Sequence, residues 1–105
     1  MTINKFKASK RRIDSMLFDS QLEASYYCQL KILKRVGEVR YWLRQVSMHL
    51  PGGKKYVCDF LVFYTDGSHA YIDVKGVETQ LFKLKKSIVE EIYPIEIKIV
   101  KKGEF

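Results

Sequence analysis

Two strand-like runs joined by a short turn place the tightest constraint on how this chain can fold. Residues 56–64 and 69–75 are rich in β-branched and aromatic side chains, and the turn cluster of residues 65–68 (TDGS) separates them. This pattern predicts a β-hairpin. Each run also carries one acidic residue among apolar neighbours, Asp59 in the first and Asp73 in the second.

The two acids and the lysine that follows the second one suggest a metal site. Because side chains alternate along a strand, Asp73 and Lys75 share one face. Taken singly, Asp59 is explained as a solvated group on an edge strand and Asp73 as a partner of Lys75. Taken together, two buried carboxylates need a neutralising cation, and Mg²⁺ prefers carboxylate oxygens. Such a site suits hydrolysis of a phosphodiester.

A capping-box signal predicts the first helix. Ser20 is followed three residues later by Glu23, which is the spacing of a reciprocal helix cap. The helix should run to about Arg35, with Gly37 as its stop signal. Its predicted buried stripe has helical spacing and consists of Leu22, Tyr26, Leu30 and Leu33.

The remaining periodic segments predict two strands and a second helix. Residues 39–50 read as a strand that is polar on one face, and the Pro-Gly-Gly of residues 51–53 ends it. Residues 80–92 read as a helix that Pro94 ends, and residues 95–99 alternate as a last strand. The predicted buried stripe of this second helix is Leu81, Leu84, Ile88 and Ile92.

The order of these elements predicts a small α/β fold. Three strands form an antiparallel meander, and a helix then crosses over to add a fourth strand parallel to the third, with the usual right-handed connection. The two helices cover one face each, or both cover the same face. Residues 1–19 are polar and basic and are interpreted as an arm, ordered at most in part, so that residues 20–105 form the single domain.

Composition narrows the class of protein. The chain has 105 residues, and its apolar content of 47% excludes a disordered chain. Its net charge of +7 suits a polyanionic partner such as nucleic acid. No apolar run has the ~20 residues of a membrane span. The two cysteines, Cys28 and Cys58, are expected to be reduced and largely buried in a cytoplasmic protein.

The acid motifs resemble those of the PD-(D/E)xK nuclease superfamily, which includes restriction enzymes, phage endonucleases and Holliday-junction resolvases. Asp59 is followed, after thirteen residues, by Asp73-Val74-Lys75 and then Gly76. Cys58 stands where the superfamily's motif has its proline. The resemblance extends over about residues 20–100. The same motifs are also similar to those of small phage proteins placed in the superfamily. The resemblance implies a restriction-endonuclease-like core.

The resemblance also implies roles for individual residues. Asp59 and Asp73 would bind Mg²⁺, for which Mn²⁺ could substitute, and Lys75 would act on the attacking water or on the phosphate. Glu23 matches the place of a further metal-binding glutamate on the first helix, although the capping box explains it equally well. Gln45 is a weaker candidate for the rim of the site. The number of metal ions stays open, and no small-molecule cofactor is expected.

Basic side chains near the expected site suggest how DNA is held. Lys83, Lys85 and Lys86 lie at the start of the second helix, where Thr79 is a candidate cap. The helix amides at this end could bind a phosphate. In the N-terminal arm, Arg11 and Arg12 could lie along a duplex backbone. Contacts of this kind position DNA without reading its base sequence.

The sequence therefore predicts a metal-dependent, phage-type DNA endonuclease that cleaves through Asp59, Asp73, Lys75 and Glu23. A chain this short has no room for a specificity domain, so recognition of DNA structure or branches is expected more than recognition of sequence. A homodimer would allow two strands to be cut. If a phage encodes the chain, its place is the host cytoplasm. The alternative is a non-catalytic DNA-binding or replication-complex interaction module that retains the nuclease fold.

Overall fold

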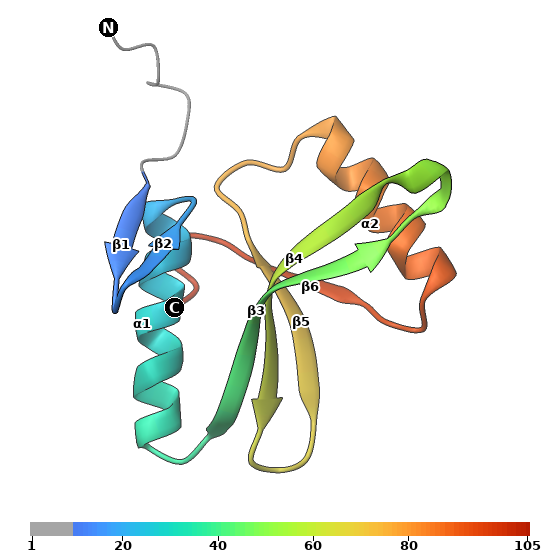
Figure 1. Cartoon of the computed structure of the whole chain (residues 1–105). Helices are drawn as coiled ribbons and strands as arrows, with labels where there is room; N and C mark the ends of the chain where they lie inside the picture. Colours follow the sequence, from blue (N-terminus) through green and yellow to red (C-terminus); the bar gives the residue numbers. More distant parts are fainter. Residues whose placement is uncertain (1–9) are drawn as a thin grey trace, which may run out of the picture.

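The chain forms an α/β fold in which two helices flank a mixed four-stranded sheet (Figure 1). The structure is a computed structural model that describes residues 10–105. None of the helices in this part of the chain has the length and apolar character needed to cross a membrane. The elements are β1 (Arg11–Ile13), β2 (Met16–Phe18), α1 (Gln21–Arg35), β3 (Val39–His49), η2 (Pro51–Gly53), β4 (Lys55–Tyr64), β5 (His69–Val74), α2 (Gln80–Ile92) and β6 (Ile97–Val100).

The topology of the main sheet confirms the predicted meander and crossover. The strand order is β3-β4-β5-β6, with antiparallel pairing in β3–β4 and β4–β5. After α2, β6 pairs with β5 in parallel. The helices and strands lie close to the residue ranges expected from periodicity, because each segment carries both a consistent apolar pattern and a turn or cap at its ends.

The helices cover opposite parts of the sheet with two separate cores (Figure 1). The first core joins α1 to the sheet and includes Leu30, Phe60 and Val62. The second joins α2 to the sheet and includes Cys58 and Val89. The prediction that Cys58 is buried is confirmed, whereas Cys28 is exposed on α1 and that part of the prediction is wrong.

Strand β4 changes the side on which its core residues pack. Tyr56 and Cys58 pack in the α2 core, whereas Phe60 and Val62 pack in the α1 core. These residues are all two apart and would share one face of a flat strand. The strand therefore bends and twists at Asp59, between the two halves, which is where β3 and β4 cross in Figure 1.

The predicted buried stripe of α2 is wrong in three of its four positions. Leu81, Leu84 and Ile92 are exposed large apolar side chains. The helix buries Val89 instead, and Phe82 packs against the same core. The pair Phe82 and Val89 is seven residues apart and lies on one helix face. Packing of the larger aromatic ring against β4 thus decides the rotation of the helix.

The N-terminal arm is folded onto the domain from residue 10 onwards. β1 and β2 form a hairpin with a two-residue turn, Asp14-Ser15, whose φ values of 52° and 66° are those of a type I′ turn. Phe18 is fully buried in the α1 core, and its ring centroid lies 5.0 Å from that of Tyr27 with the planes tilted by 39°. The core thus begins before residue 20. Residues 1–9 of the expected arm lie outside the described residues.

Candidate functional site

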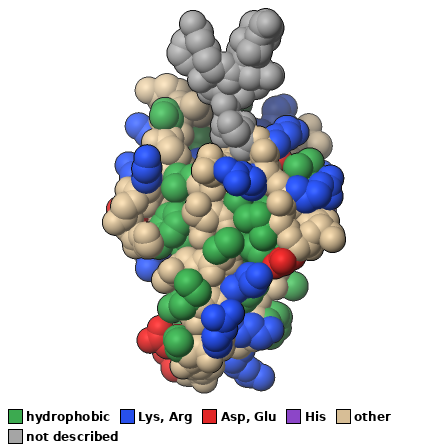
Figure 2. Space-filling model, turned by 90° about the vertical axis from the view of Figure 1, so that its left-hand side faces the viewer, with side chains coloured by type: hydrophobic (Ala, Val, Ile, Leu, Met, Phe, Trp, Pro, Cys, Tyr) green, Lys and Arg blue, Asp and Glu red, His purple; other side chains and the backbone are tan. Residues whose placement is uncertain are grey.

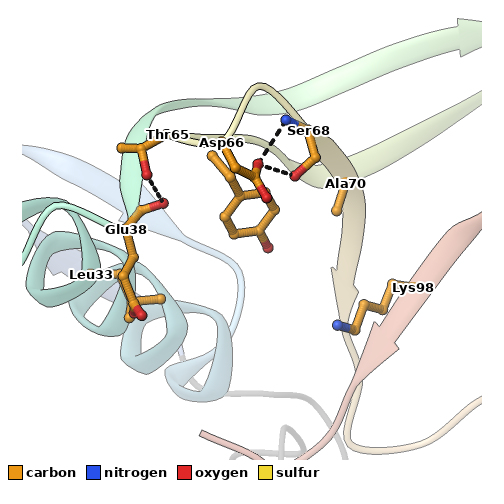
Figure 3. Close-up of a pocket in the computed structure, with 8 residues that line it drawn as sticks. Leu33, Glu38, Thr65, Asp66, Ser68, Ala70 and Lys98 are labelled. Atoms are coloured by element: carbon orange, nitrogen blue, oxygen red, sulfur yellow. Dashed lines mark hydrogen bonds between the residues drawn. The ribbon is translucent and has the colours of Figure 1, made fainter.

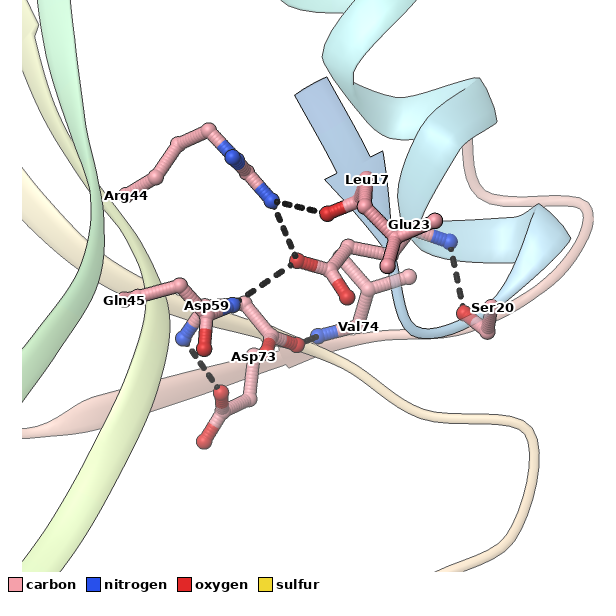
Figure 4. Close-up of polar contacts among 8 residues, drawn as sticks. All are labelled: Leu17, Ser20, Glu23, Arg44, Gln45, Asp59, Asp73 and Val74. Carbon is pink, nitrogen blue, oxygen red and sulfur yellow. Dashed lines mark hydrogen bonds and ion pairs between the residues drawn. The ribbon is translucent and has the colours of Figure 1, made fainter. Parts of the chain in front are cut away.

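Asp59 and Asp73 face each other across β4 and β5, at the bend of the sheet (Figure 4). The register that pairs Phe60 with Ile72 places the two acids opposite each other one position further on. The Asp59 backbone N–H donates to Asp73 Oδ1 at 2.8 Å, and the Val74 N–H donates to Asp59 Oδ2 at 2.9 Å. Carboxylate oxygens thus accept main-chain hydrogen bonds at this position of the sheet.

Asp73 is 1% exposed, and one of its oxygens is unsatisfied. Asp73 Oδ2 is buried and finds no hydrogen-bond partner within residues 10–105. A buried carboxylate oxygen without a partner is costly. Native proteins retain such an atom where a water, an ion, a ligand or a catalytic role accounts for it.

Glu23 reaches the same region from the first turn of α1. Its backbone N–H donates to Ser20 Oγ at 2.9 Å, so the main chain serves the helix cap. Its carboxylate points to β3 instead, where Oε2 accepts from Gln45 Nε2 at 3.1 Å. The two roles expected to compete are thus divided between the main chain and the side chain of one residue. Glu23 is only 2% exposed.

Gln45, which donates a hydrogen bond to Glu23, has a rarely populated backbone conformation. Its φ of 53° lies in the left-handed region, although it sits inside β3 and is not glycine. The register of β3 with β4 places it opposite Asp59. Such a conformation costs on the order of 1–3 kcal/mol and persists where the surrounding structure imposes it. The expected rim residue therefore lies at the bend itself.

Arg44 is a site residue that the sequence analysis missed. Its Nη2 lies 3.8 Å from Glu23 Oε2 and donates to the Leu17 carbonyl at 3.2 Å. Its guanidinium also lies 4.0 Å from the centre of the Phe18 ring. These contacts bring β2, α1 and β3 together. No sequence signal reveals them, because Arg44 reads only as a polar position on a strand.

The site carries an excess of negative charge. The pKa of Glu23 is raised to about 7, mainly by burial and also by the nearby Asp59, while Arg44 opposes the shift. Burial also raises the pKa of both Asp59 and Asp73, while main-chain hydrogen bonds and Lys75 oppose that shift. Each carboxylate is therefore less stable in its charged form than in water. A cation bound here would stabilise the charged form of all three carboxylates.

Lys75 lies directly after β5, beside the two aspartates. Its positive charge lowers the pKa of both Asp59 and Asp73. Its Nζ lies 4.5 Å from the centre of the Phe82 ring, so α2 holds the ammonium group in place through a cation–π contact. Asp59, Asp73 and Lys75 are thus brought together as the sequence motif indicates.

The donor set fits a divalent cation in its chemistry, although it is not a closed cage. Within residues 10–105, no three His, Cys, Asp or Glu side chains form a ready-made metal cluster. The fit rests on the unpartnered Asp73 Oδ2 and on the raised pKa values of Asp59 and Asp73. Oxygen ligands of this type, completed by waters, are what Mg²⁺ takes.

Cys58 does not belong to the donor set. Burial raises the pKa of its thiol to about 12, which keeps the group neutral. The thiol lies 3.4 Å from the Ile72 carbonyl, to which it donates. Its position next to Asp59 is therefore structural.

The predicted DNA-binding residues fall into two groups. On α2, Thr79 accepts from the Phe82 N–H at 3.1 Å and so caps the helix as expected, while Lys86 pairs with Glu90 at 3.0 Å. Lys83 is exposed and Lys85 is half-buried. On β1, Arg11 and Arg12 are exposed. Figure 2 shows the side of the molecule that carries α1 and the hairpin, over which basic side chains are spread and acidic ones are few.

A pocket in another part of the molecule is a poor candidate for the site. It measures about 510 Å³ and lies at the β4–β5 turn, at the far end of these strands from Asp59 and Asp73 (Figure 3). Asp66, in its wall, accepts hydrogen bonds from the N–H and hydroxyl of Ser68. These bonds lower the pKa of Asp66. Its polar groups therefore stabilise the turn.

The chain is thus an α/β protein whose mixed sheet carries Asp59 and Asp73 side by side at its bend. The family described as "Protein of unknown function (DUF1064)" matches residues 3–103, which is nearly the whole chain. The chain belongs to this family. No curated protein matches it.

Proposed function

We propose that this protein is a magnesium-dependent DNA endonuclease whose site comprises Asp59, Asp73, Glu23 and Lys75. The unpartnered Oδ2 atom of buried Asp73 is the observation that carries the proposal. It lies in a group of acids whose pKa values are raised by burial. The resemblance of the Asp59 and Asp73-Val74-Lys75 motifs to PD-(D/E)xK nucleases supports the same assignment.

The carboxylates would hold the cation. Asp73 offers a free oxygen, Asp59 lies on the facing strand, and Glu23 approaches from α1. A bound divalent ion supplies positive charge to the scissile phosphate and lowers the pKa of a bound water. The fixed hydrogen bonds from the Asp59 and Val74 amides orient the two aspartates for this task.

Lys75 supplies the second part of the chemistry. Its ammonium group, held over Phe82 and beside two carboxylates, can stabilise charge that develops on the phosphate oxygens. Acting as a base for the attacking water would require a lowered pKa. The contact with the Phe82 ring and the two neighbouring carboxylates support the electrostatic role.

The expected substrate is DNA whose structure or branching is recognised more than its base sequence. The net charge of +7 favours a polyanion. A homodimer, in which two sites address two strands, belongs to the same proposal. Sedimentation would test it by giving a mass of about twice 12.4 kDa.

One observation favours a second candidate, a non-catalytic DNA-binding module with the same fold. Arg44 lies 3.8 Å from Glu23 and neutralises part of the acidic charge without any metal. In that case the site would need no divalent ion. Cleavage assays separate this candidate from the enzyme.

The decisive experiment incubates the protein with linear, nicked and four-way-junction DNA, with Mg²⁺, with Mn²⁺ and with a chelator. Metal-dependent cleavage by the wild type supports the enzyme. Asp73→Asn should abolish cleavage while DNA binding stays intact or becomes tighter, because the change removes a ligand and one charge that repels phosphates. Lys75→Ala should also abolish cleavage.

The matched control is Asp66→Asn. Asp66 lies on the same hairpin but at the turn, where its carboxylate accepts hydrogen bonds from Ser68. This variant should cleave at the wild-type rate. Full activity of Asp73→Asn, or no cleavage by the wild type with either metal, would refute the proposed enzyme.

A further inference from the structure

The face of the sheet opposite α1 carries a row of aromatic side chains, and Tyr71 at one end of the row also packs against the α2 core. We define the aromatic row as Tyr41 on β3, Phe63 on β4, and His69 and Tyr71 on β5. The Tyr41 and Phe63 rings are stacked, with centroids 4.6 Å apart and planes 20° apart. Phe63 and His69 lie 6.3 Å apart, and His69 and Tyr71 lie 6.0 Å apart. The row therefore crosses three strands.

An irregularity in β3 turns Tyr41 onto this face. Val39 and Tyr41 are two residues apart and would normally point the same way. The register with β4 shifts between them, as at a β-bulge. Val39 is consequently buried in the α1 core, whereas Tyr41 is 46% exposed and stacks on Phe63.

The Tyr41 side chain is partly exposed to solvent. Phe63 covers the inner face, and β3 is the edge of its sheet in the described part of the chain, so no strand lies beyond Tyr41. A flat ring placed there would extend the existing stack. Leu43, two residues along β3, is 49% exposed but has no ring on which a base could stack.

We propose that the aromatic row binds unpaired DNA bases by stacking, with Tyr41 as the platform. This inference rests on the proposed function and names the substrate feature that the enzyme recognises. Along β4, Phe63 lies four residues from Asp59, which corresponds to ~14 Å of strand. Unpaired nucleotides held on the row would therefore place a neighbouring phosphate near the carboxylates.

The chemistry of the surroundings suits nucleotides. No member of the aromatic row is acidic, and the chain carries a net charge of +7. A pocket of about 290 Å³ lies beside His69 and Tyr71 and is also lined by Lys98 and Glu96, one side chain of each charge. Stacking on aromatic rings is tolerant of sequence because every base has a π face. Selection of unpaired regions follows without base readout.

The size of the surface argues against a second copy of the chain as its occupant. A stable protein interface needs ~800 Å² from each partner. Fully buried aromatic side chains contribute about 150–250 Å² each, so these partly exposed groups offer roughly 300 Å² in total. That area covers one or two bases.

The test measures DNA binding in the presence of EDTA, so that cleavage plays no part. Fluorescence anisotropy compares a single-stranded oligonucleotide of about 12 nucleotides with a duplex of the same sequence. Tyr41→Ala should weaken single-strand binding by between about 5-fold and 100-fold and leave duplex binding unchanged. Tyr41→Trp should bind as tightly as the wild type or more tightly.

Leu43→Ala is the control, because Leu43 is equally exposed on the same strand but has no ring. It should bind as the wild type does. An unchanged dissociation constant of Tyr41→Ala for the single strand overturns the inference, as does a wild type that binds no single strand. Sedimentation in which Tyr41→Ala converts a dimer to a monomer assigns the surface to a second copy instead. A wild type that binds the single strand through Tyr41 but does not cleave DNA in a separate Mg²⁺ assay refutes the nuclease and leaves this inference standing.

Discussion

Glu23 shows how one residue can serve both the fold and the site. Its main chain is part of the α1 cap, and its side chain is buried against Gln45 and Arg44. The sequence could indicate that Glu23 matters, because the capping spacing and the resemblance both point to it. It could not show the division of roles, since that depends on where the helix start lies relative to β3.

The raised pKa of Glu23 predicts a specific pH dependence of stability. In the folded state its pKa is about 7, compared with an ordinary 4.5, so the folded protein binds the proton more tightly. Stability should therefore fall as pH rises from 4.5 to 7, by on the order of 3 kcal/mol, and stay low above that range. Thermal melts of wild type and Glu23→Gln without metal would measure this, because glutamine does not titrate.

The same variant separates the structural and functional readings of Glu23. Glutamine still serves a helix cap but binds Mg²⁺ poorly. Relative to the wild type, Glu23→Gln should gain stability between pH 5 and pH 8 and should lose cleavage by orders of magnitude. A variant that cleaves at the wild-type rate would leave Glu23 only its role in the cap.

At the scale of elements, the pairing of the two acids was predictable and the neighbours of the site were not. A short turn between two strands sets their register, so Asp59 and Asp73 had to meet. Arg44 contacts Leu17, 27 residues earlier, and nothing local in the chain indicates that contact. The bend at Gln45 depends on a φ value that glutamine rarely adopts. The rotation of α2 likewise followed from the packing of Phe82.

The β1–β2 hairpin is predicted to stabilise the site through the contacts of β2 with Arg44. Phe18 is fully buried and packs on both Tyr27 and the Arg44 guanidinium. Phe18→Ala should destabilise the protein by about 3–5 kcal/mol in urea denaturation. It should also lower cleavage, because Arg44 loses its support.

Leu17→Ala is the control for Phe18, since Leu17 precedes it in β2 and is exposed. Its effect should stay within about 0.5 kcal/mol. A similarly small effect of Phe18→Ala would mean that the hairpin is dispensable and that the domain begins at α1.

At the scale of the whole molecule, the distribution of charge predicts how DNA is held. Arg11 and Arg12 are exposed on the hairpin, which packs against α1. If each contacts one phosphate, replacing both with alanine should reduce the slope of log K against log salt by about 2. Anisotropy titrations of duplex DNA at several salt concentrations would measure the slope.

Lys34 provides the comparison for these arginines. It lies in the last turn of α1, eleven residues and ~16 Å along the helix from Glu23. Lys34→Ala should leave the slope unchanged. An equal change of slope for Lys34→Ala and for the arginine pair would indicate diffuse attraction by the net charge instead of a defined binding path.

The two amide hydrogens that bond to Asp59 and Asp73 have a practical consequence for spectroscopy. The N–H groups of Asp59 and Val74 donate directly to the carboxylates on which the proposed chemistry depends. Their chemical shifts and their exchange rates with deuterium must respond when either carboxylate gains a proton or an ion. The backbone therefore contains two built-in probes, and a ¹⁵N-labelled sample can report occupancy of the site without any substrate.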